Sequence, residues 1–409
     1  MRDVSASTVA DVWVVMLVAV LVRVAYWTSK WDAALLFNDS VYYSGQAVKL
    51  FHGEWFRDPF FDMPGAEHGP LTSLLMAPLS GGSDPHRWQR LVTVVCGIVL
   101  VWLVMKWVSE MTSTRAGLIA GGLAAVHPNL WMNDGLVMAE SVALVLMVAG
   151  LWTAWRRSRG VGRLGWWAPG VLLGLASLAR SEMLLVAVIV AGWWLWRERG
   201  SGCWRLLVAA VVVVTPWTAW NATRFDAPVL LTTNEGGVML GANCDATYSG
   251  RDIGGWSILC LGADPEYRPD EDAAVRSSRQ RSIAASYVRS HLSSVPEVMA
   301  ARVLRTFDLY GFESQMHQDV GEERPRWAVW AGIVVFWVLV PLSVLGWRKL
   351  GRDARPFVLA PVVVSVVTAL VFYAGHRLRV TGEPSMTVLS AVGVAHVLAS
   401  RVARRGADT

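Results

Sequence analysis

The sequence predicts an all-α polytopic membrane protein with about ten transmembrane helices. Of its 409 residues, 54% are hydrophobic and only 17% are charged, against roughly 25% charged in an ordinary soluble domain. The basic residues punctuate the hydrophobic runs and do not gather in one soluble segment, which argues against a nucleic-acid-binding protein. A helix that crosses the hydrocarbon core needs about 20 residues, so ten crossings would use roughly half of the chain.

Ten apolar runs suit such crossings. They lie at 9–27, 91–108, 116–131, 136–155, 166–178, 183–196, 206–220, 327–347, 357–373 and 385–398. Tryptophans stand at many of their ends, as membrane-interface anchors do.

The orientation follows from basic clusters at 156–163, 197–205, 348–355 and 401–405, which fall on one side if ten helices are threaded. The positive-inside rule makes that side the cytoplasm, so we expect a multi-pass plasma-membrane protein with both termini cytoplasmic. Two long polar segments then face outward together. We therefore expect three parts, which are a transmembrane module over 1–220 with a first outer loop at about 28–90, an outer cap over 221–326, and C-terminal transmembrane helices over 327–409.

Two of the four cysteines, Cys244 and Cys260, share the second outer segment. The oxidising compartment permits a disulfide, which would stabilise the loop by about 3 kcal/mol in the chain-entropy model. A zinc site would need two further ligands, and only Asp245 is close. We assign no metal site and no cofactor, and a divalent-cation requirement stays open.

The first outer loop offers the clearest candidate acid. If a helix starts near Ser40, then Asp39, Tyr42 and Tyr43 project on one face. A carboxylate at the membrane boundary can act as a general base if apolar neighbours raise its pKa. The alternative is a helix cap.

Three further positions are candidates, each with a plain structural alternative. Glu67 and His68 precede a Gly-Pro turn, where His68 suits an anionic headgroup or is simply solvated. Glu140 lies one or two turns inside the outer face, where an acid faces a cavity or a partner unless the position is wet. Arg180 lies between two short spans, where it can bind the donor or pair with Glu182.

Arg377 and Arg379 lie at the outward mouth of the last two spans. In an extended loop their period-two spacing would point both side chains the same way. The planar guanidinium suits phosphate oxygens, and interfacial snorkelling is the alternative.

Several of these segments, in this order, resemble a known family. They are "NDSVYY", "HGPL", "GLASLARSE", "PWTAWNATRFDAPVLLTTNEGGVMLGAN" and "HRLRVTGEPSM". Over most of its length the chain is similar to polytopic GT-C glycosyltransferases of the bacterial group related to protein O-mannosyltransferases and aminoarabinose transferases. The closing segment resembles an Arg-x-Arg-x-Pro-x-x-Pro signature, although Thr381 and Gly382 replace a more usual proline region. The "HGPL" segment departs from the Lys-Pro-Pro-Leu of the aminoarabinose transferases.

The resemblance implies a GT-C fold and transfer of a hexose or pentose, with inversion, from a polyprenyl-phosphate donor at the outer face. It implies that Asp39 is similar to the catalytic base, and we add Glu140 as a second catalytic candidate. The expected phosphate-binding residues are Arg377, Arg379, His68 and Arg180. The expected pocket residues are Tyr42, Tyr43, Glu67 and Asn234. The acceptor would be a glycan, a lipid or a protein, in contact with the bilayer.

Two other functions stay open on the sequence. A flippase or transporter of lipid-linked sugars would be expected to show paired halves around a midplane site, and the sequence shows no internal repeat. A polysaccharide polymerase also has many spans and an outer loop. It would transfer a whole repeat unit, which distinguishes it from an enzyme that transfers one sugar.

Overall fold

The computed structural model describes residues 6–36, 39–198, 202–268 and 270–407. Asn38 of the first outer motif and Arg199 of the second basic cluster therefore lie outside the described residues. Across the described ranges the regular structure is helical, with one isolated antiparallel bridge between Arg57 and Pro64. The predicted all-α class is confirmed.

Each of the ten apolar runs overlaps a helix. These helices are α1 (Ala6–Ser29), α4 (Pro85–Met111), α5 (Thr114–Val126), α7 (Glu140–Ser158), α8 (Trp167–Ala179), α9 (Met183–Arg197), α10 (Trp204–Asn221), α16 (Arg326–Lys349), α17 (Arg355–Val371) and α19 (Glu383–Ala407). In the described ranges, four spans are long and apolar enough to cross a membrane by length and composition alone: Val9–Ser29, Pro85–Met111, Arg326–Lys349 and His376–Ala403. The run at 116–131 is split, because Pro128 cannot continue α5 and begins the short α6 (Pro128–Trp131).

The two long polar segments, which the sequence predicts to be the outer segments, carry shorter helices. The first holds α2 (Asp39–Phe51), α3 (Pro70–Met76) and a 3-10 turn, Ala77–Leu79. The second holds α11 (Glu235–Gly241), α12 (Asp245–Tyr248), α13 (Ala273–Ser290), α14 (Val295–Thr306) and α15 (Phe312–Gly321), with 3-10 turns at Gly250–Asp252 and Ile258–Ala263. Pro296 lies in the first turn of α14, where proline is tolerated, so the chain breaks just before it.

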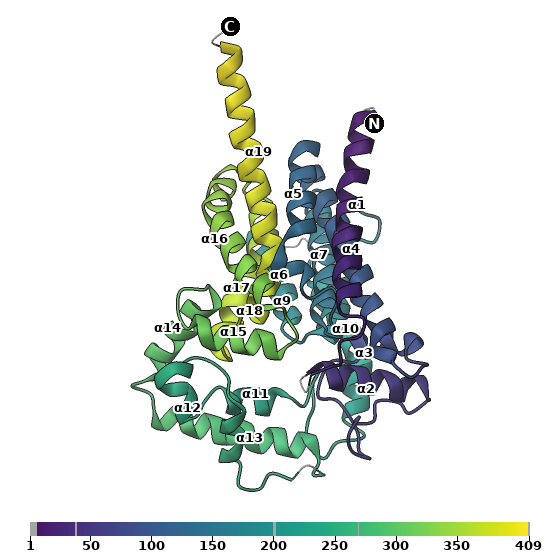
Figure 1. The fold of residues 1–409 in the computed structure, drawn as a ribbon, viewed down its shortest axis with the longest axis vertical. Coiled ribbons are helices and arrows are strands. Elements are labelled where there is room, and N and C mark those ends of the chain that lie inside the picture. Colours follow the sequence, from purple (N-terminus) through teal and green to yellow (C-terminus); the bar gives the residue numbers. More distant parts are fainter. Residues whose placement is uncertain (1–5, 37–38, 199–201, 269, 408–409) are drawn as a thin grey trace.

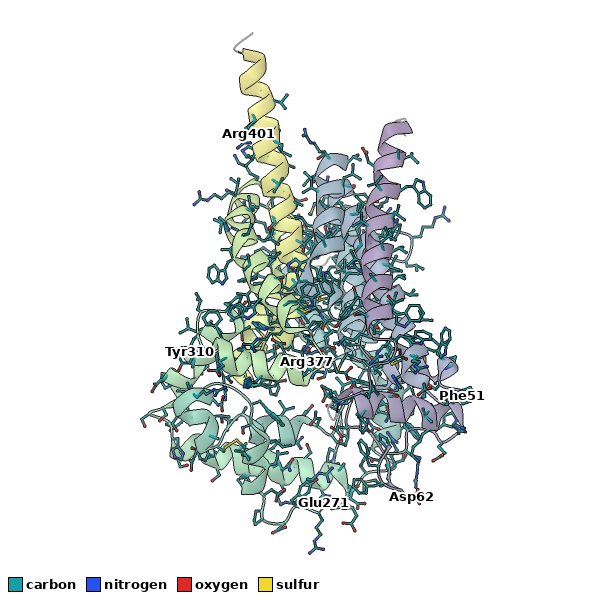
Figure 2. The ribbon with its side chains drawn as sticks, in the orientation of Figure 1. Phe51, Asp62, Glu271, Tyr310, Arg377 and Arg401 are labelled. Carbon is teal, nitrogen blue, oxygen red and sulfur yellow. A yellow bond between two sulfur atoms is a disulfide. The ribbon has the colours of Figure 1, made fainter. Side chains whose placement is uncertain are left out.

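Both termini lie at one end of the molecule, and the helices of the two outer segments gather at the opposite end (Figure 1). Arg159 and Asp353 form an ion pair of 2.8 Å that joins the turns of two predicted cytoplasmic clusters. Figure 2 shows Arg401 toward the terminal end, Asp62 and Glu271 at the far end, and Arg377 between them. The two polar segments therefore share one side of the bundle.

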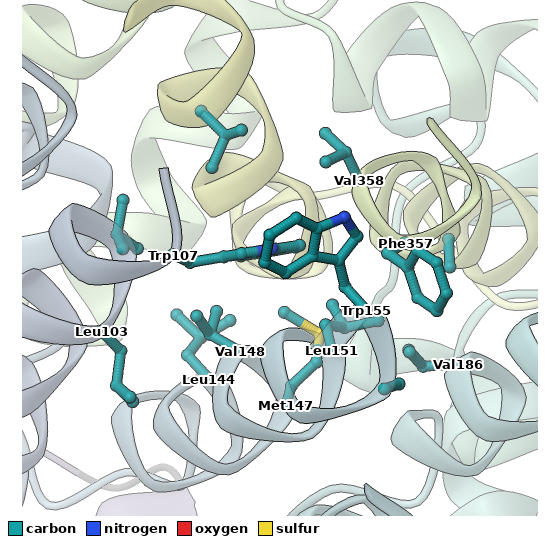
Figure 3. Packing of buried hydrophobic residues seen from close by; sticks show 14 of the residues in the cluster. Leu103, Trp107, Leu144, Met147, Val148, Leu151, Trp155, Val186, Phe357 and Val358 are labelled. Atoms are coloured by element: carbon teal, nitrogen blue, oxygen red, sulfur yellow. The ribbon is translucent and has the colours of Figure 1, made fainter. Parts of the chain in front are cut away.

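The core lies among the long helices (Figure 3). Trp107 of α4 is 1% exposed and belongs to one apolar cluster with Met147 of α7 and Phe357 of α17. Helices α16 and α19 approach closely through glycine, since an added Cβ on Gly346 would lie 1.8 Å from the Leu389 carbonyl oxygen. Small residues at helix contacts are typical of membrane bundles, because close packing replaces the hydrophobic effect there.

Candidate active site

A cavity of about 340 Å3 lies where the outer segments meet the bundle. Its walls come from α2, the segment before α3, the α8–α9 turn, the start of α11 and the region from the end of α17 to α18 (His376–Arg379). The predicted site residues in its lining are Asp39, Tyr43, Glu67, His68, Arg180, Asn234 and Arg377. Segments from distant parts of the chain thus form one site.

Local structure places these side chains. Asp39 is the first residue of α2, and Tyr43 lies one turn later, as the predicted face requires. Gly69, which follows His68, allows the chain to approach the end of α8 closely, because a Cβ there would lie 2.3 Å from the Leu178 carbonyl oxygen. Arg180 caps α8 in extended conformation, and the chain turns directly into α9.

Carboxylate and guanidinium groups form a connected set of ion pairs beside the cavity. Arg377 Nη1 lies 2.6 Å from Asp39 Oδ2, and Arg377 Nε lies 2.5 Å from Glu140 Oε1. Arg180 Nη1 lies 2.5 Å from the same Glu140 oxygen, and Arg180 also pairs with Glu182. Glu140 therefore holds both arginines side by side, where they can bind an anion.

The ion pair sets the charge of Asp39. Burial on its own would raise the pKa of Asp39, but Arg377 and His68 hold that pKa well below its ordinary value. The carboxylate is thus ionised in this state, and a group that separates it from Arg377 would raise its proton affinity.

His68 is fixed on both sides by aromatic rings. It stacks on Tyr43 with ring centroids 4.6 Å apart, and Tyr42 meets it edge-on at 5.3 Å. Its Nε2 lies 3.6 Å from Asp39 Oδ1 and 3.9 Å from Glu67 Oε1. Burial lowers the pKa of His68, yet Asp39 and Glu67 raise it above the ordinary value overall, which favours the cation.

Of the other predicted pocket residues, two line the cavity and one lies behind its wall. Glu67 lines the cavity, and burial raises the pKa of its carboxyl group. Asn234 lines it from the start of α11. Tyr42 does not line it; its hydroxyl accepts a hydrogen bond from the Glu67 backbone N–H at 3.1 Å and supports the wall from behind.

Glu140 has a different place from the one expected of a catalytic group. It is 0% exposed, does not line the cavity and touches Arg180 and Arg377 from behind. An acid there contacts the two cationic side chains and does not face the cavity. We therefore regard Glu140 as a positioning residue.

The expectation that Arg377 and Arg379 point the same way is wrong. Both lie on the short helix α18, where two residues span about 200° of rotation. Arg379 is 2% exposed and pairs with Asp308 and with Glu383, whose Oε1 is 2.8 Å from Arg379 Nε. Arg379 does not line the cavity.

Sequence reasoning missed other members of the site. Glu322 Oε1 lies 3.4 Å from Arg377 Nη1, and Tyr373 lines the cavity beside it. An apolar hollow of about 310 Å3 between α9 and α10 shares Leu184 and Leu230 with the cavity. In sequence, Glu322 resembles any solvated acid, and the hollow arises only when α9 and α10 pack.

Cys244 and Cys260 are joined in the structure, with an S–S distance of 2.12 Å and Cα atoms 5.6 Å apart. Cys96 and Cys203 are free thiols. Within the described ranges, no group of three or more His, Cys, Asp or Glu side chains is arranged to hold a metal ion.

Part of the chain matches a known family in sequence. Residues 71–220 match the family described as dolichyl-phosphate-mannose-protein mannosyltransferase. That stretch includes Glu140 and Arg180 and excludes Asp39 and Arg377. Among curated protein sequences, none matches the chain.

Solved structures extend the likeness to the whole chain. The apo oligosaccharyltransferase of Archaeoglobus fulgidus is 15% identical with a TM-score of 0.60, over 98% of this chain and 52% of that one. AglB from the same organism, in complex with an inhibitory peptide and a dolichol-phosphate, is 14% identical with a TM-score of 0.54, over 97% and 51%. ArnT from Cupriavidus metallidurans, bound to undecaprenyl phosphate, is 15% identical with a TM-score of 0.46, over 93% and 77%.

The chain thus spans about half the length of the oligosaccharyltransferases that it matches. The likeness confirms the predicted GT-C fold of the polytopic glycosyltransferases.

Proposed function

We propose that this protein is a glycosyltransferase that moves a sugar from a polyprenyl-phosphate carrier to an acceptor at the outer face of the plasma membrane, with inversion. One observation carries the proposal: the carboxylate of Asp39 lines the same cavity as Arg377 and Arg180 and is paired with Arg377. The cavity thus brings a candidate base and an anion-binding pair of arginines together. The match to a mannosyltransferase family over residues 71–220 and the GT-C fold support it.

The apolar hollow supports a lipid-linked donor. It is lined mainly by aliphatic and small side chains of α10 with Leu184 of α9, and it shares Leu184 and Leu230 with the cavity. An isoprenoid chain can lie there, in contact with lipid, while its phosphate reaches Arg180 and Arg377. The donor then meets the outer segments without leaving the bilayer.

The reaction needs few groups. Asp39 takes the proton of the acceptor as the acceptor bonds to the anomeric carbon, and the bond from that carbon to the phosphate oxygen breaks. The leaving polyprenyl phosphate gains negative charge, which Arg377, Arg180 and cationic His68 stabilise. Attack from the side opposite the phosphate inverts the anomeric centre.

Donor binding also has to change one contact. In the resting state Arg377 is paired with Asp39, so a phosphate that binds Arg377 competes with that carboxylate. The phosphate therefore frees Asp39 and raises its pKa as the donor arrives. The base becomes stronger when it is needed.

The test is incubation of the purified protein with polyprenyl-phosphate-linked sugars and detection of free polyprenyl phosphate. A flippase would move the intact lipid and release none. Transfer of a single sugar, read from the product mass, separates this reaction from a polymerase.

A further inference from the structure

Glu323 has an unusual backbone and an unusual burial for an acid. Its φ is +67°, in the left-handed region that side chains other than glycine rarely adopt. Only 7% of the residue is exposed. A strained residue of this kind is unfavourable on its own and persists where its surroundings fix it.

The carboxylate of Glu323 contacts the chain on both sides of Asp39. Its Oε1 accepts hydrogen bonds from the Leu36 backbone N–H at 3.2 Å and from the Ser40 hydroxyl at 2.7 Å. Leu36 lies three residues before Asp39, and Ser40 directly follows it. One oxygen atom therefore holds both flanks of the proposed base.

The other oxygen of Glu323 is anchored to the bundle. Oε2 lies 3.3 Å from Nη2 of Arg90, near the start of α4. Arg90 also donates to the backbone oxygens of Lys30 and Ala33, and Lys30 Nζ donates to the Glu323 backbone oxygen. Lys30, Ala33 and Leu36 are thus tied to Arg90 of α4 and to Glu323 at the end of the second polar segment.

We infer that Glu323 is a positioning residue that holds Asp39 against Arg377 until the donor phosphate takes the place of Asp39 on that arginine. The adjacent Glu322 contacts Arg377 itself, so residues 322 and 323 contact one member of the Asp39–Arg377 pair and the residues that flank the other. The strained backbone is the conformation that sends these two neighbouring side chains to different partners. This inference rests on the proposed function, because it assigns Glu323 a part in exposing the phosphate site.

The experiment measures binding of undecaprenyl phosphate to the full chain in nanodiscs by native mass spectrometry, with thermal stability recorded for each variant. Glu323→Gly removes the carboxylate and accepts the left-handed backbone. We expect affinity to rise by about threefold to tenfold, because Asp39 no longer holds Arg377 as firmly. Asp39→Asn should raise affinity at least as much, and the double variant should gain nothing further.

Glu323→Gln is the partial rescue variant. Its amide oxygen can still accept from Leu36 and Ser40, but its NH2 group replaces the oxygen that pairs with Arg90, so its affinity should fall between those of the wild type and Glu323→Gly. The matched control is Asp134→Asn, which removes another buried carboxylate that is paired with Arg23 at 3.0 Å and does not line the cavity. It should lower stability and leave affinity unchanged.

The outcomes separate the two claims. If the wild type binds undecaprenyl phosphate and the effects of Glu323→Gly and Asp39→Asn simply add, or Glu323→Gly lowers affinity, the positioning role is wrong. If the wild type does not bind undecaprenyl phosphate at all, the proposed function itself fails.

Discussion

Arg377 and Arg379 are two residues apart on one short helix, and they belong to two different charged regions. Arg377 lines the cavity and shares it with Asp39, His68 and Arg180. Arg379 is enclosed by Asp308 and Glu383, and Glu383 Oε2 also lies 3.3 Å from His127 Nε2. His376 pairs with Asp308 and Asp319 and so joins the same enclosed region to α15.

The difference between these regions is one of access. In the cavity, the ion pairs can exchange a carboxylate for a phosphate, because a ligand can reach them. In the enclosed region, every partner comes from the protein, and removal of one charge leaves the other buried and uncompensated. Substitutions in the first region should change catalysis, and substitutions in the second should change stability.

The largest expected effect is that of Asp39→Asn. The amide keeps the shape of the side chain but cannot accept the proton of the acceptor, so turnover should fall by about 10²–10⁴-fold. The rate of polyprenyl phosphate release measures it. Turnover near the wild-type rate would remove Asp39 from the mechanism.

Arg377→Ala should reduce turnover by about 10²–10³-fold, because the leaving phosphate loses a charge-assisted contact as its own charge grows. Lysine at this position should restore part of the rate, since it returns charge without the bidentate fork. Comparison of turnover with undecaprenyl phosphate affinity distinguishes stabilisation of the leaving phosphate from simple binding of the headgroup. A change in affinity alone would mean that Arg377 only holds the headgroup.

Arg379→Ala should act on stability. It removes the guanidinium shared by Asp308 and Glu383, which then keep only their histidine partners, at a cost of about 3–5 kcal/mol. Thermal unfolding in detergent measures this loss, and the fraction that stays folded should bind undecaprenyl phosphate as the wild type does. A stable protein with lost binding would erase the distinction between the two regions.

The Cys244–Cys260 bridge closes a loop with a sequence separation of 16. Its removal by a double Cys→Ser substitution should destabilise the outer segment by about 3 kcal/mol. The turnover rate should change little, because neither cysteine lines the cavity. Peptide mass mapping without reductant checks the bridge, and two alkylatable thiols in the native protein would contradict it.

The smallest expected effect is a pH dependence. Burial lowers the pKa of His68 but Asp39 raises it overall, above its ordinary value of about 6.5. The attraction of His68 to phosphate is therefore full below pH 6.5 and is lost as the pH rises through the raised pKa. The contribution of the His68–Asp39 pair to folding stability is lost over the same pH range. Affinity for undecaprenyl phosphate should fall by roughly tenfold across that range, and His68→Gln should bind weakly at every pH. An identical profile in both proteins would show that His68 stays neutral.

Much of this arrangement was predictable from the sequence. Each apolar run marks a helix, and candidates from five separate segments meet in one cavity because all five lie at the end of the bundle where the two long polar segments gather (Figure 1). Arg379 was not predictable, since spacing in an assumed loop says nothing about the helix that forms there. Glu322 and Glu323 were not predictable either, because an acidic pair beside a span looks solvated until the fold covers it.

The central claim is that Asp39 is the base in sugar transfer from a polyprenyl-phosphate donor. Measurement of released polyprenyl phosphate tests it most directly. Wild-type protein and Asp39→Asn are incubated with the lipid-linked sugars extracted from membranes of the producing cell, and released polyprenyl phosphate is quantified by mass spectrometry. The account predicts release by the wild type and at most about 1% of that rate from Asp39→Asn. No release above a protein-free control, or equal release by both proteins, would contradict it.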